Sequence, residues 1–160
     1  MNVVDSQDVV KEFQGDYRFL SNFWFVDIEF DGEIYRTVEH AYQAAKTLDL
    51  REREQIRISP TPGSAKRRGR YVKMRKDWDN IKIDIMLSLL RKKFQDECLK
   101  KKLLATGNRI LQEGNMWGDI LWGVDLKSGK GKNMLGKLIM NVRKEIQDDE
   151  KANQASSIIR

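Results

Sequence analysis

Apolar and polar residues alternate most clearly over residues 25–36, on either side of Asp31 and Gly32. Alternation with a period of two is typical of a β-strand that buries one face. An Asp-Gly pair between two such runs favours a tight turn, because both residues tolerate the left-handed backbone that the turn needs. The sequence therefore predicts an antiparallel hairpin near the N-terminus.

Helical spacing replaces the alternation after the hairpin. Thr37 is the expected N-cap of a helix over residues 38–48, and a second short helix is expected over residues 49–58. Residues 59–63 contain both prolines of the chain and should end that helix, because proline lacks a backbone donor. Ser64 is the expected N-cap of the helix that follows.

The second half of the chain is also mainly helical in its pattern. Apolar side chains at three- and four-residue steps predict a long helix over residues 78–94, with Asp77 as its N-cap. A further helix is expected to end at residues 106–107, where a threonine precedes a glycine. The last helix carries apolar side chains on one side over residues 135–146.

Short strands are predicted around residues 110–111 and 121–122. Helix outweighs strand, so the expected fold class is α+β: a mainly helical single domain with a small antiparallel sheet near the N-terminus. We assign residues 1–147 to this domain and expect residues 148–160 to form a flexible C-terminal tail.

Composition narrows the class of protein. The chain has 160 residues, of which 40% are hydrophobic and 34% are charged, with a net charge of +6. One cysteine, Cys98, cannot form an internal disulfide, and one histidine, His40, cannot build a Cys/His zinc site. No apolar run approaches the roughly 18 residues of a membrane span. We expect a cytoplasmic protein with no membrane partner, and we assign Cys98 no role.

Three functional side chains share one stripe of the predicted helix 38–48. Glu39, Gln43 and Lys46 stand at i, i+4 and i+7, so a carboxylate, an amide and an amine line up. One interpretation is a solvated helix face, and the other is a catalytic stripe. His40 lies beside it, and a lone histidine is more often a structural residue than a general base.

Positive charge is concentrated in residues 51–76, which hold ten lysines and arginines against two glutamates, a local charge of +8. We interpret residues 62–70 as a glycine-containing loop that enters a helix N-terminus. Such a loop could collect phosphate oxygens, with Lys66, Arg67 and Arg70 nearby. The alternative is charge that only improves solubility. The segment lacks the Gly-Lys-Ser/Thr ending of a P-loop.

The tryptophans divide between core and pocket. Trp117 and Trp122 lie in a glycine-rich stretch beside carboxylates such as Asp119. Core packing is the usual explanation for tryptophan, but an indole can also stack on a base and an aspartate can bind ribose hydroxyls. We expect Trp122 in the core and Trp117 in a pocket wall, and Trp78 fits either place.

Together these stretches resemble the NADAR superfamily. The superfamily includes riboflavin-intermediate N-glycosidases and enzymes that remove ADP-ribose from guanine in nucleic acid. The similarity lies in residues 19–23, 38–46, 62–70, 77–78, 117–119 and 131–136. It covers nearly the whole chain, in the same order. The resemblance implies cleavage of the N-glycosidic bond between a ribose carbon and a base nitrogen.

A bond of this kind breaks through an oxocarbenium-like transition state, which needs negative charge near the sugar. The resemblance implies that Glu39 supports this cation or activates water, and that Asp119 orients the ribose or shares that role. Lys46 either stays charged against phosphate or attacks the anomeric carbon to form an imine, and Lys66 has the same two options. Neither a metal nor another cofactor is expected, since the acidic residues show no ligand spacing.

The resemblance also implies a set of residues that line the substrate pocket. These are Asn22, Phe23, Tyr42, Gln43, Lys66, Arg67, Arg70, Trp78, Trp117 and Asn133. A structural alternative for Asn22 is a turn side chain that bonds to its own backbone.

The expected partner is a phosphorylated nucleoside or an ADP-ribosyl substrate. Within that class, an aminouracil ribose phosphate of early riboflavin synthesis competes with guanine that carries ADP-ribose in nucleic acid. The local charge of +8 favours the larger anion. A function of another class is a noncatalytic module that binds ADP-ribose or nucleic acid. The oligomeric state stays open.

Overall fold

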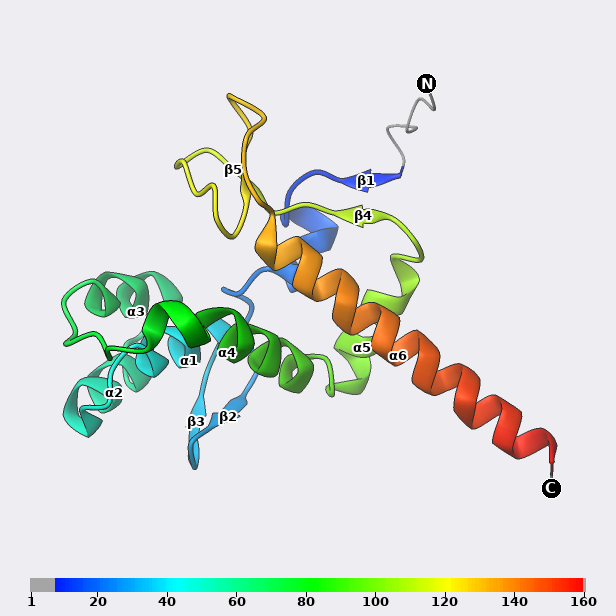
Figure 1. Ribbon diagram of the computed structural model, residues 1–160, viewed down its shortest axis with the longest axis horizontal. Helices are drawn as coiled ribbons and strands as arrows, with labels where there is room; N and C mark the ends of the chain where they lie inside the picture. Colours follow the sequence, from blue (N-terminus) through cyan, green and yellow to red (C-terminus); the bar gives the residue numbers. More distant parts are fainter. Residues whose placement is uncertain (1–7, 160) are drawn as a thin grey trace. The chain divides into compact units, whose positions relative to one another are not determined.

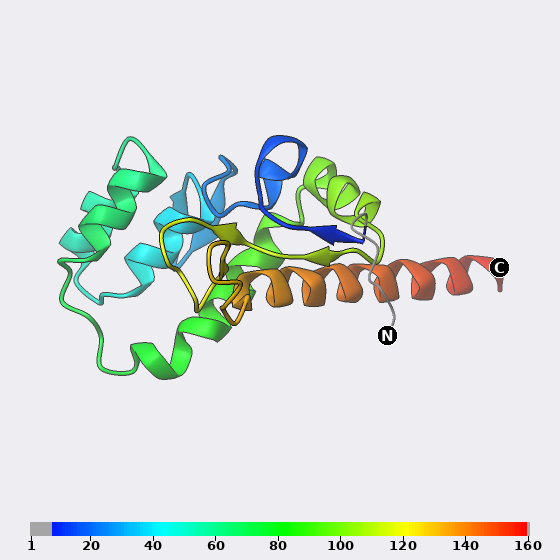
Figure 2. The same ribbon diagram turned by 90° about the horizontal axis from the view of Figure 1, so that it is seen from above.

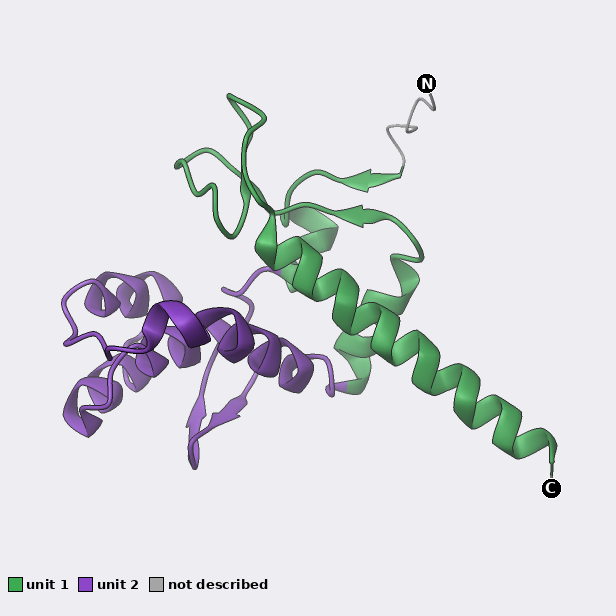
Figure 3. Cartoon of the chain, in the orientation of Figure 1, with its two compact units in different colours: residues 1–20, 97–160 green, residues 21–96 purple. Residues whose placement is uncertain are grey.

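The computed structural model describes residues 8–159 (Figure 1). These residues form two compact units, one of residues 8–20 and 97–159 and the other of Ser21–Asp96 (Figure 3). The fold is mainly helical with short two-stranded sheets, so the predicted class is confirmed. Among residues 8–159 there is no helix whose length and apolar character would let it cross a membrane.

Unit Ser21–Asp96 consists of a hairpin followed by four helices. In chain order these are β2 (Ile28–Phe30), β3 (Glu33–Tyr35), α1 (Val38–Ala45), α2 (Leu50–Arg57), α3 (Pro62–Gly69) and α4 (Trp78–Lys93). The strands pair antiparallel, with Ile28 opposite Tyr35. Asp31 and Gly32 have φ angles of 50° and 84°, the left-handed values that the tight turn requires. The predicted hairpin is therefore confirmed.

The cap of α1 is the predicted one, and α2 begins close to its predicted start. The Thr37 side chain accepts from His40 N at 3.1 Å at the start of α1. Asp49 Oδ1 accepts from Arg51 N at 2.8 Å at the start of α2. Both helices begin within a residue of where the sequence places them, because a side-chain acceptor satisfies donors that a first helical turn leaves unpaired.

The predicted cap of α3 is wrong, whereas the predicted cap of α4 is in place but makes no capping hydrogen bond. The cap of α3 is Thr61 and not Ser64: Thr61 Oγ1 accepts from Ser64 N, while Ser64 Oγ accepts from Thr61 N. This capping box starts the helix at Pro62, where a missing N–H does no harm. Asp77 does precede α4, but its carboxylate binds the Arg75 guanidinium at 2.7 Å and makes no capping hydrogen bond.

Helix α1 forms the centre of this unit and packs against α2, α3 and α4. Its small residues Ala41, Ala44 and Ala45 are fully buried and allow the neighbouring helices to approach closely. His40 is also fully buried, with Nδ1 2.8 Å from Thr37 Oγ1 and Nε2 3.0 Å from the Ser59 carbonyl. The histidine is thus a structural residue.

The other unit combines short strands, two helices and a 3-10 helix. Its elements are β1 (Val9–Val10), η1 (Gly15–Leu20), α5 (Glu97–Ala105), β4 (Ile110–Leu111), β5 (Gly114–Asn115), β6 (Val124–Asp125) and α6 (Met134–Ile158). Strand β1 pairs parallel with β4, and β5 pairs parallel with β6. The predicted strand at residues 110–111 is confirmed, as is a helix that ends before residues 106–107.

The strand predicted at residues 121–122 is wrong. Leu121 N and Trp122 N both donate to Asp119 Oδ1, at 3.1 and 2.9 Å. A side chain thus takes the donors that a ladder would need, and the chain bends there instead. The strands of this region are β5 and β6, on either side of the bend.

The last helix is longer than its apolar stripe. Leu135, Leu138, Ile139 and Val142 are buried, which confirms the predicted inner face of α6. The helix continues to Ile158, as Figure 2 shows. Residues 148–159 are all exposed. This is the stretch that the sequence analysis expects to be flexible, and in the structure its backbone is helical.

Candidate active site

Glu39 lies in the first turn of α1 and is only 7% exposed. Gln43 Nε2 donates to Glu39 Oε1 at 2.7 Å, and Gln43 itself is 3% exposed. The Glu39 backbone N–H donates to the carbonyl of Asn22 at 3.1 Å. The interpretation of this stripe as a solvated face is therefore wrong, because the carboxylate and the amide are both buried and bonded to each other.

Helix α3 holds Gln43 in place from the other side. Gly69 is buried against it, and a Cβ atom at this position would overlap with Gln43 Oε1 and lie 2.7 Å from Gln43 Cδ. Gln43 Oε1 has no hydrogen-bond partner among the described residues, whereas its amide N–H is directed at the carboxylate. A carboxylate accepts only, so this orientation of the amide is the one that bonds Glu39.

Lys46 follows at the C-cap of α1 and is half-buried. Burial lowers the pKa of its ammonium below the ordinary value of 10.5. The charge of Glu39 opposes this lowering of the pKa, and the positive charges of Lys66, Arg70 and Lys82 add to it. The structure thus brings these four charged groups close enough to Lys46 to change its proton affinity.

Lys82 is the residue of this group that sequence reasoning missed. It lies on α4, four residues after Trp78 and therefore on the same face of the helix. Its Nζ pairs with Asp79 Oδ1 at 3.0 Å. The four-residue spacing from Trp78, which the sequence places in the pocket, is the pattern that could have indicated Lys82.

Two aromatic side chains stand beside the charged groups. Lys46 Nζ lies 5.6 Å from the centre of the Tyr42 ring, and the Tyr42 and Trp78 ring centres are 5.1 Å apart at an angle of 57°. Both rings are buried. A cation at this distance from a ring is attracted by its face, so Tyr42 helps to place the amine.

The turn before the hairpin holds Asn22 and Phe23. Phe23 N donates to Ser21 Oγ at 3.1 Å, so Ser21 and not Asn22 makes the side-chain bond within the turn. Asn22 is 8% exposed, and its Nδ2 is 3.6 Å from Met86 Sδ. Its Oδ1 has no partner within residues 8–159. The structural alternative for Asn22 is thus wrong.

The expected phosphate loop at residues 62–70 is also wrong. This segment is itself helix α3, with Lys66 and Arg67 in its last turn and Arg70 as its C-cap. Basic side chains at this end are favourable for the helix dipole, whereas backbone donors for an anion would lie at the other end. Lys66 and Arg70 still act on Lys46 through their charge, and Arg67 is exposed.

The remaining predicted residues belong to the other unit. Asp119 Oδ1 accepts the two backbone N–H groups of Leu121 and Trp122, and Asp119 N donates to Asn115 Oδ1 at 3.0 Å. Asp119 therefore shapes its own loop. Trp122, expected in the core, is half-buried.

Trp117 and Asn133 also lie in this unit. Trp117 is 63% exposed within it. Asn133 has a φ angle of 50°, its Oδ1 accepts from Glu113 N at 3.0 Å, and its Nδ2 donates to the Leu111 carbonyl at 2.9 Å. The Asn133 amide thus joins two loops at the start of α6.

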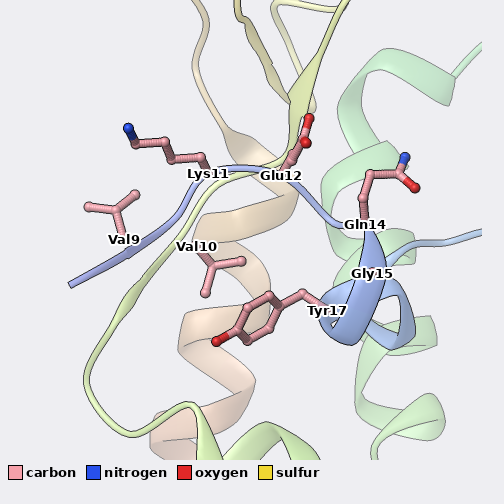
Figure 4. A pocket seen from close by; sticks show the side chains of 7 residues that line it. All are labelled: Val9, Val10, Lys11, Glu12, Gln14, Gly15 and Tyr17. Carbon is pink, nitrogen blue, oxygen red and sulfur yellow. The ribbon is translucent and has the colours of Figure 1, made fainter. Parts of the chain in front are cut away.

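The same unit contains a cavity of about 540 Å³ that the sequence does not indicate (Figure 4). It is lined by Val9, Val10, Lys11, Glu12, Gln14, Gly15 and Tyr17. None of these residues belongs to the predicted site, and Tyr17 Oη accepts a hydrogen bond from Arg109 at 2.8 Å.

Comparison with known proteins agrees with the resemblance. Residues 10–147 match the model of the NADAR domain. The chain belongs to the NADAR domain family. It is 40% identical over 146 residues to the N-glycosidase YbiA of Escherichia coli (strain K12), covering 88% of this chain and 90% of that one.

Two further comparisons extend this one. The NMR structure of the E. coli protein YbiA matches with a TM-score of 0.78 and 37% identity, covering 90% of this chain and 88% of that one. The riboflavin biosynthesis protein VVA0006 of Vibrio vulnificus (strain YJ016) is 34% identical over 150 residues, which are 92% of this chain and 40% of that one. With a full-length N-glycosidase relative at 40% identity, this NADAR protein is an N-glycosidase.

The packing of α3 on Gln43 predicts that Gly69→Ala impairs the enzyme. The new methyl group must displace Gln43, which then releases the Glu39 carboxylate. We expect kcat/KM to fall by about 10- to 100-fold, because a small displacement of side chains is enough for a loss of this size. Base release measures the effect on activity, and the melting temperature measures the effect on stability.

Gly63→Ala is the matched control on the same helix. A Cβ at Gly63 meets its nearest atoms at 3.7 Å, an ordinary contact, so activity should stay near the wild-type value. Equal activity of the two variants would show that Gly69 does not position Gln43.

Proposed function

We propose that this chain hydrolyses the base–ribose bond of a phosphorylated ribosyl compound, with Glu39 as the carboxylate that faces the sugar. The observation that supports this most directly is a buried carboxylate, oriented by Gln43, next to an amine whose pKa is lowered. A perturbed titratable group beside an oriented carboxylate is typical of an active site.

Glu39 would act on the developing positive charge of the sugar. The attraction between a carboxylate and an oxocarbenium ion is stronger in a partly desolvated site than in water. Gln43 keeps the carboxylate in one orientation, so little reorganisation is needed when the bond breaks. The same group could also accept a proton from an attacking water molecule.

Lys46 is the proposed nucleophile. A lowered pKa increases the fraction of neutral amine near neutral pH, and only the neutral form can attack the anomeric carbon. Attack would form a bond from the Lys46 nitrogen to the anomeric carbon and break the bond to the base, which leaves with a proton. Opening of the ribose ring at its C1–O4 bond, with transfer of the amine proton to the ring oxygen, would then give an imine, which water hydrolyses to the free sugar and the lysine amine. Lys66, Arg70 and Lys82 would then bind the phosphate, since their positive charges all act on Lys46.

The substrate we favour is an aminouracil ribose phosphate. A relative that matches 92% of this chain is named for riboflavin biosynthesis. Guanine that carries ADP-ribose is the competing substrate, favoured by the local charge of +8 in residues 51–76. Asp119 would orient a loop rather than carry charge to the sugar, because Oδ1 already accepts two backbone donors.

A Glu39→Gln protein should keep its fold and lose activity. The amide has the same size but no charge, and loss of one electrostatic contact to a transition state lowers kcat by about 10²- to 10³-fold. Glu33→Gln on the hairpin, an exposed glutamate, is the control and should leave kcat unchanged. A folded Glu39→Gln enzyme with near-full turnover would remove Glu39 from the mechanism.

Borohydride added during turnover should trap the sugar on Lys46. Mass spectrometry should find the adduct in the wild type and in Lys101→Arg, an exposed control, but not in Lys46→Arg. The rate should rise with pH as Lys46 loses its proton, with a midpoint below the ordinary 10.5 because the pKa is lowered. An active enzyme that yields no adduct would contradict the imine route.

Base release from two substrates, measured in parallel, tests the assignment. We expect release from an aminouracil ribose phosphate, with a mild dependence on salt because few counterions are displaced. Release only from an oligonucleotide with ADP-ribosylated guanine, with a steep salt dependence, would replace the proposed substrate. Tight binding without release from either would instead favour the noncatalytic module.

A further inference from the structure

Helix α4 contains a lysine that is entirely buried. Lys93 has no exposed surface, and its Nζ donates to the Ser21 carbonyl at 2.8 Å. The Nζ also lies 5.3 Å from the centre of the Phe94 ring. Burial lowers the pKa of this amine to about 7, because a charged group loses the stabilisation of water. An apolar side chain of the same length would avoid this penalty, so packing alone does not account for a lysine here.

The carbonyl that Lys93 binds closes the turn at residues 21–24. Ser21 O also accepts from Trp24 N at 3.1 Å, and Ser21 Oγ accepts from Phe23 N at 3.1 Å. The turn presents Asn22, whose side chain is nearly buried and whose Oδ1 lacks a partner in the described part of the chain. Lys93 therefore fixes the closing bond of the turn that places Asn22.

The same turn is joined to the first turn of α1. The Asn22 carbonyl accepts from Glu39 N at 3.1 Å, so the position of this turn and the start of the catalytic helix are coupled. On the other side, Asn22 Nδ2 approaches Met86 Sδ at 3.6 Å. Met86 and Lys93 are seven residues apart and therefore share one face of α4. This face thus contacts the turn at two points.

We propose that Lys93 is a positioning residue for the N-glycosidase reaction. By donating to Ser21 O it holds the turn at residues 21–24 on α4, and through Asn22 it holds Glu39 at the start of α1. This inference rests on the proposed role of Glu39. Lys93 acts through these residues and not on the substrate, because none of its surface is exposed.

Lys93→Met separates positioning from structural support. Methionine fills a similar volume and removes the buried amine, so the melting temperature should stay at or above the wild-type value. The turn loses its anchor, and kcat should fall by about tenfold or more with little change in KM, since substrate contacts are intact while Glu39 is misplaced. Lys93→Gln keeps an N–H donor and should retain more of kcat than Lys93→Met.

Lys92→Met is the matched control. The neighbouring lysine also donates to a backbone carbonyl, Glu29 O at 2.7 Å, but this carbonyl belongs to the hairpin and not to the turn. Its kcat should lie within twofold of the wild type. An equal loss in both variants would overturn the proposal, because the effect would not be specific to the turn.

Native-state hydrogen exchange tests the anchor without any assay of activity. The amides of Trp24 and Glu39 donate into the turn, and both should exchange faster in Lys93→Met, while Ala44 near the C-terminal end of α1 should not. Unchanged exchange at Trp24 and Glu39 would overturn the proposal. The proposal would also be overturned if Lys93→Met lost activity only in proportion to a fall in its melting temperature. The exchange rates can be measured even if the wild type releases no base. Failure of the Lys93 proposal can therefore be distinguished from failure of the proposed role of Glu39.

Discussion

The burial of Glu39 is the constraint on which the site in residues 21–96 depends. A carboxylate removed from water needs donors or positive charge nearby, since an unpartnered buried charge is strongly unfavourable. Gln43 supplies a donor at 2.7 Å, and the first turn of α1 places the carboxylate at the positive end of the helix dipole. Gln43 in turn fits only because position 69 is glycine. The contact between Gln43 and Gly69 therefore determines both how α1 packs on α3 and how the Glu39 carboxylate is oriented.

Positive charge is in excess around Lys46, which follows Glu39 on the same helix. The pKa of Lys46 is lowered by three positive charges, those of Lys66, Arg70 and Lys82. Only one acidic group, Glu39, raises it. Lys46, Lys66 and Lys82 are half-buried, and repulsion between such charges is screened less than repulsion at an open surface. An anionic ligand would relieve this repulsion, so its binding would also stabilise the folded protein. A cluster of this kind is kept together by the packing of α1, α3 and α4, whatever the ligand.

Local chemistry explains which parts of the fold could be predicted. The turn at Asp31 and Gly32 and the cap at Thr37 depend on residues next to each other, and both were found from the sequence. The same reasoning favours Ser64 as a cap, but Ser64 takes the reciprocal position in a capping box, and choosing between two hydroxyl residues three positions apart needs the backbone geometry. Likewise, the Asp119 side chain took the donors of a predicted strand, which no period of apolar residues could show.

The sequence predicts that the site residues share one face of α1, but it does not predict that this face is buried. Spacing places Glu39, Gln43 and Lys46 on one side of α1, and it cannot say whether water or another helix covers that side. The answer lies in α3, which brings Gly69 onto Gln43, and in α4, which brings Lys82 near Lys46. Both contacts depend on loops whose course is set by the whole unit. The alanines on one side of α1 indicate that another helix packs closely against that side. That a helix also covers the polar side of α1 is indicated only by Gly69, which lies on α3.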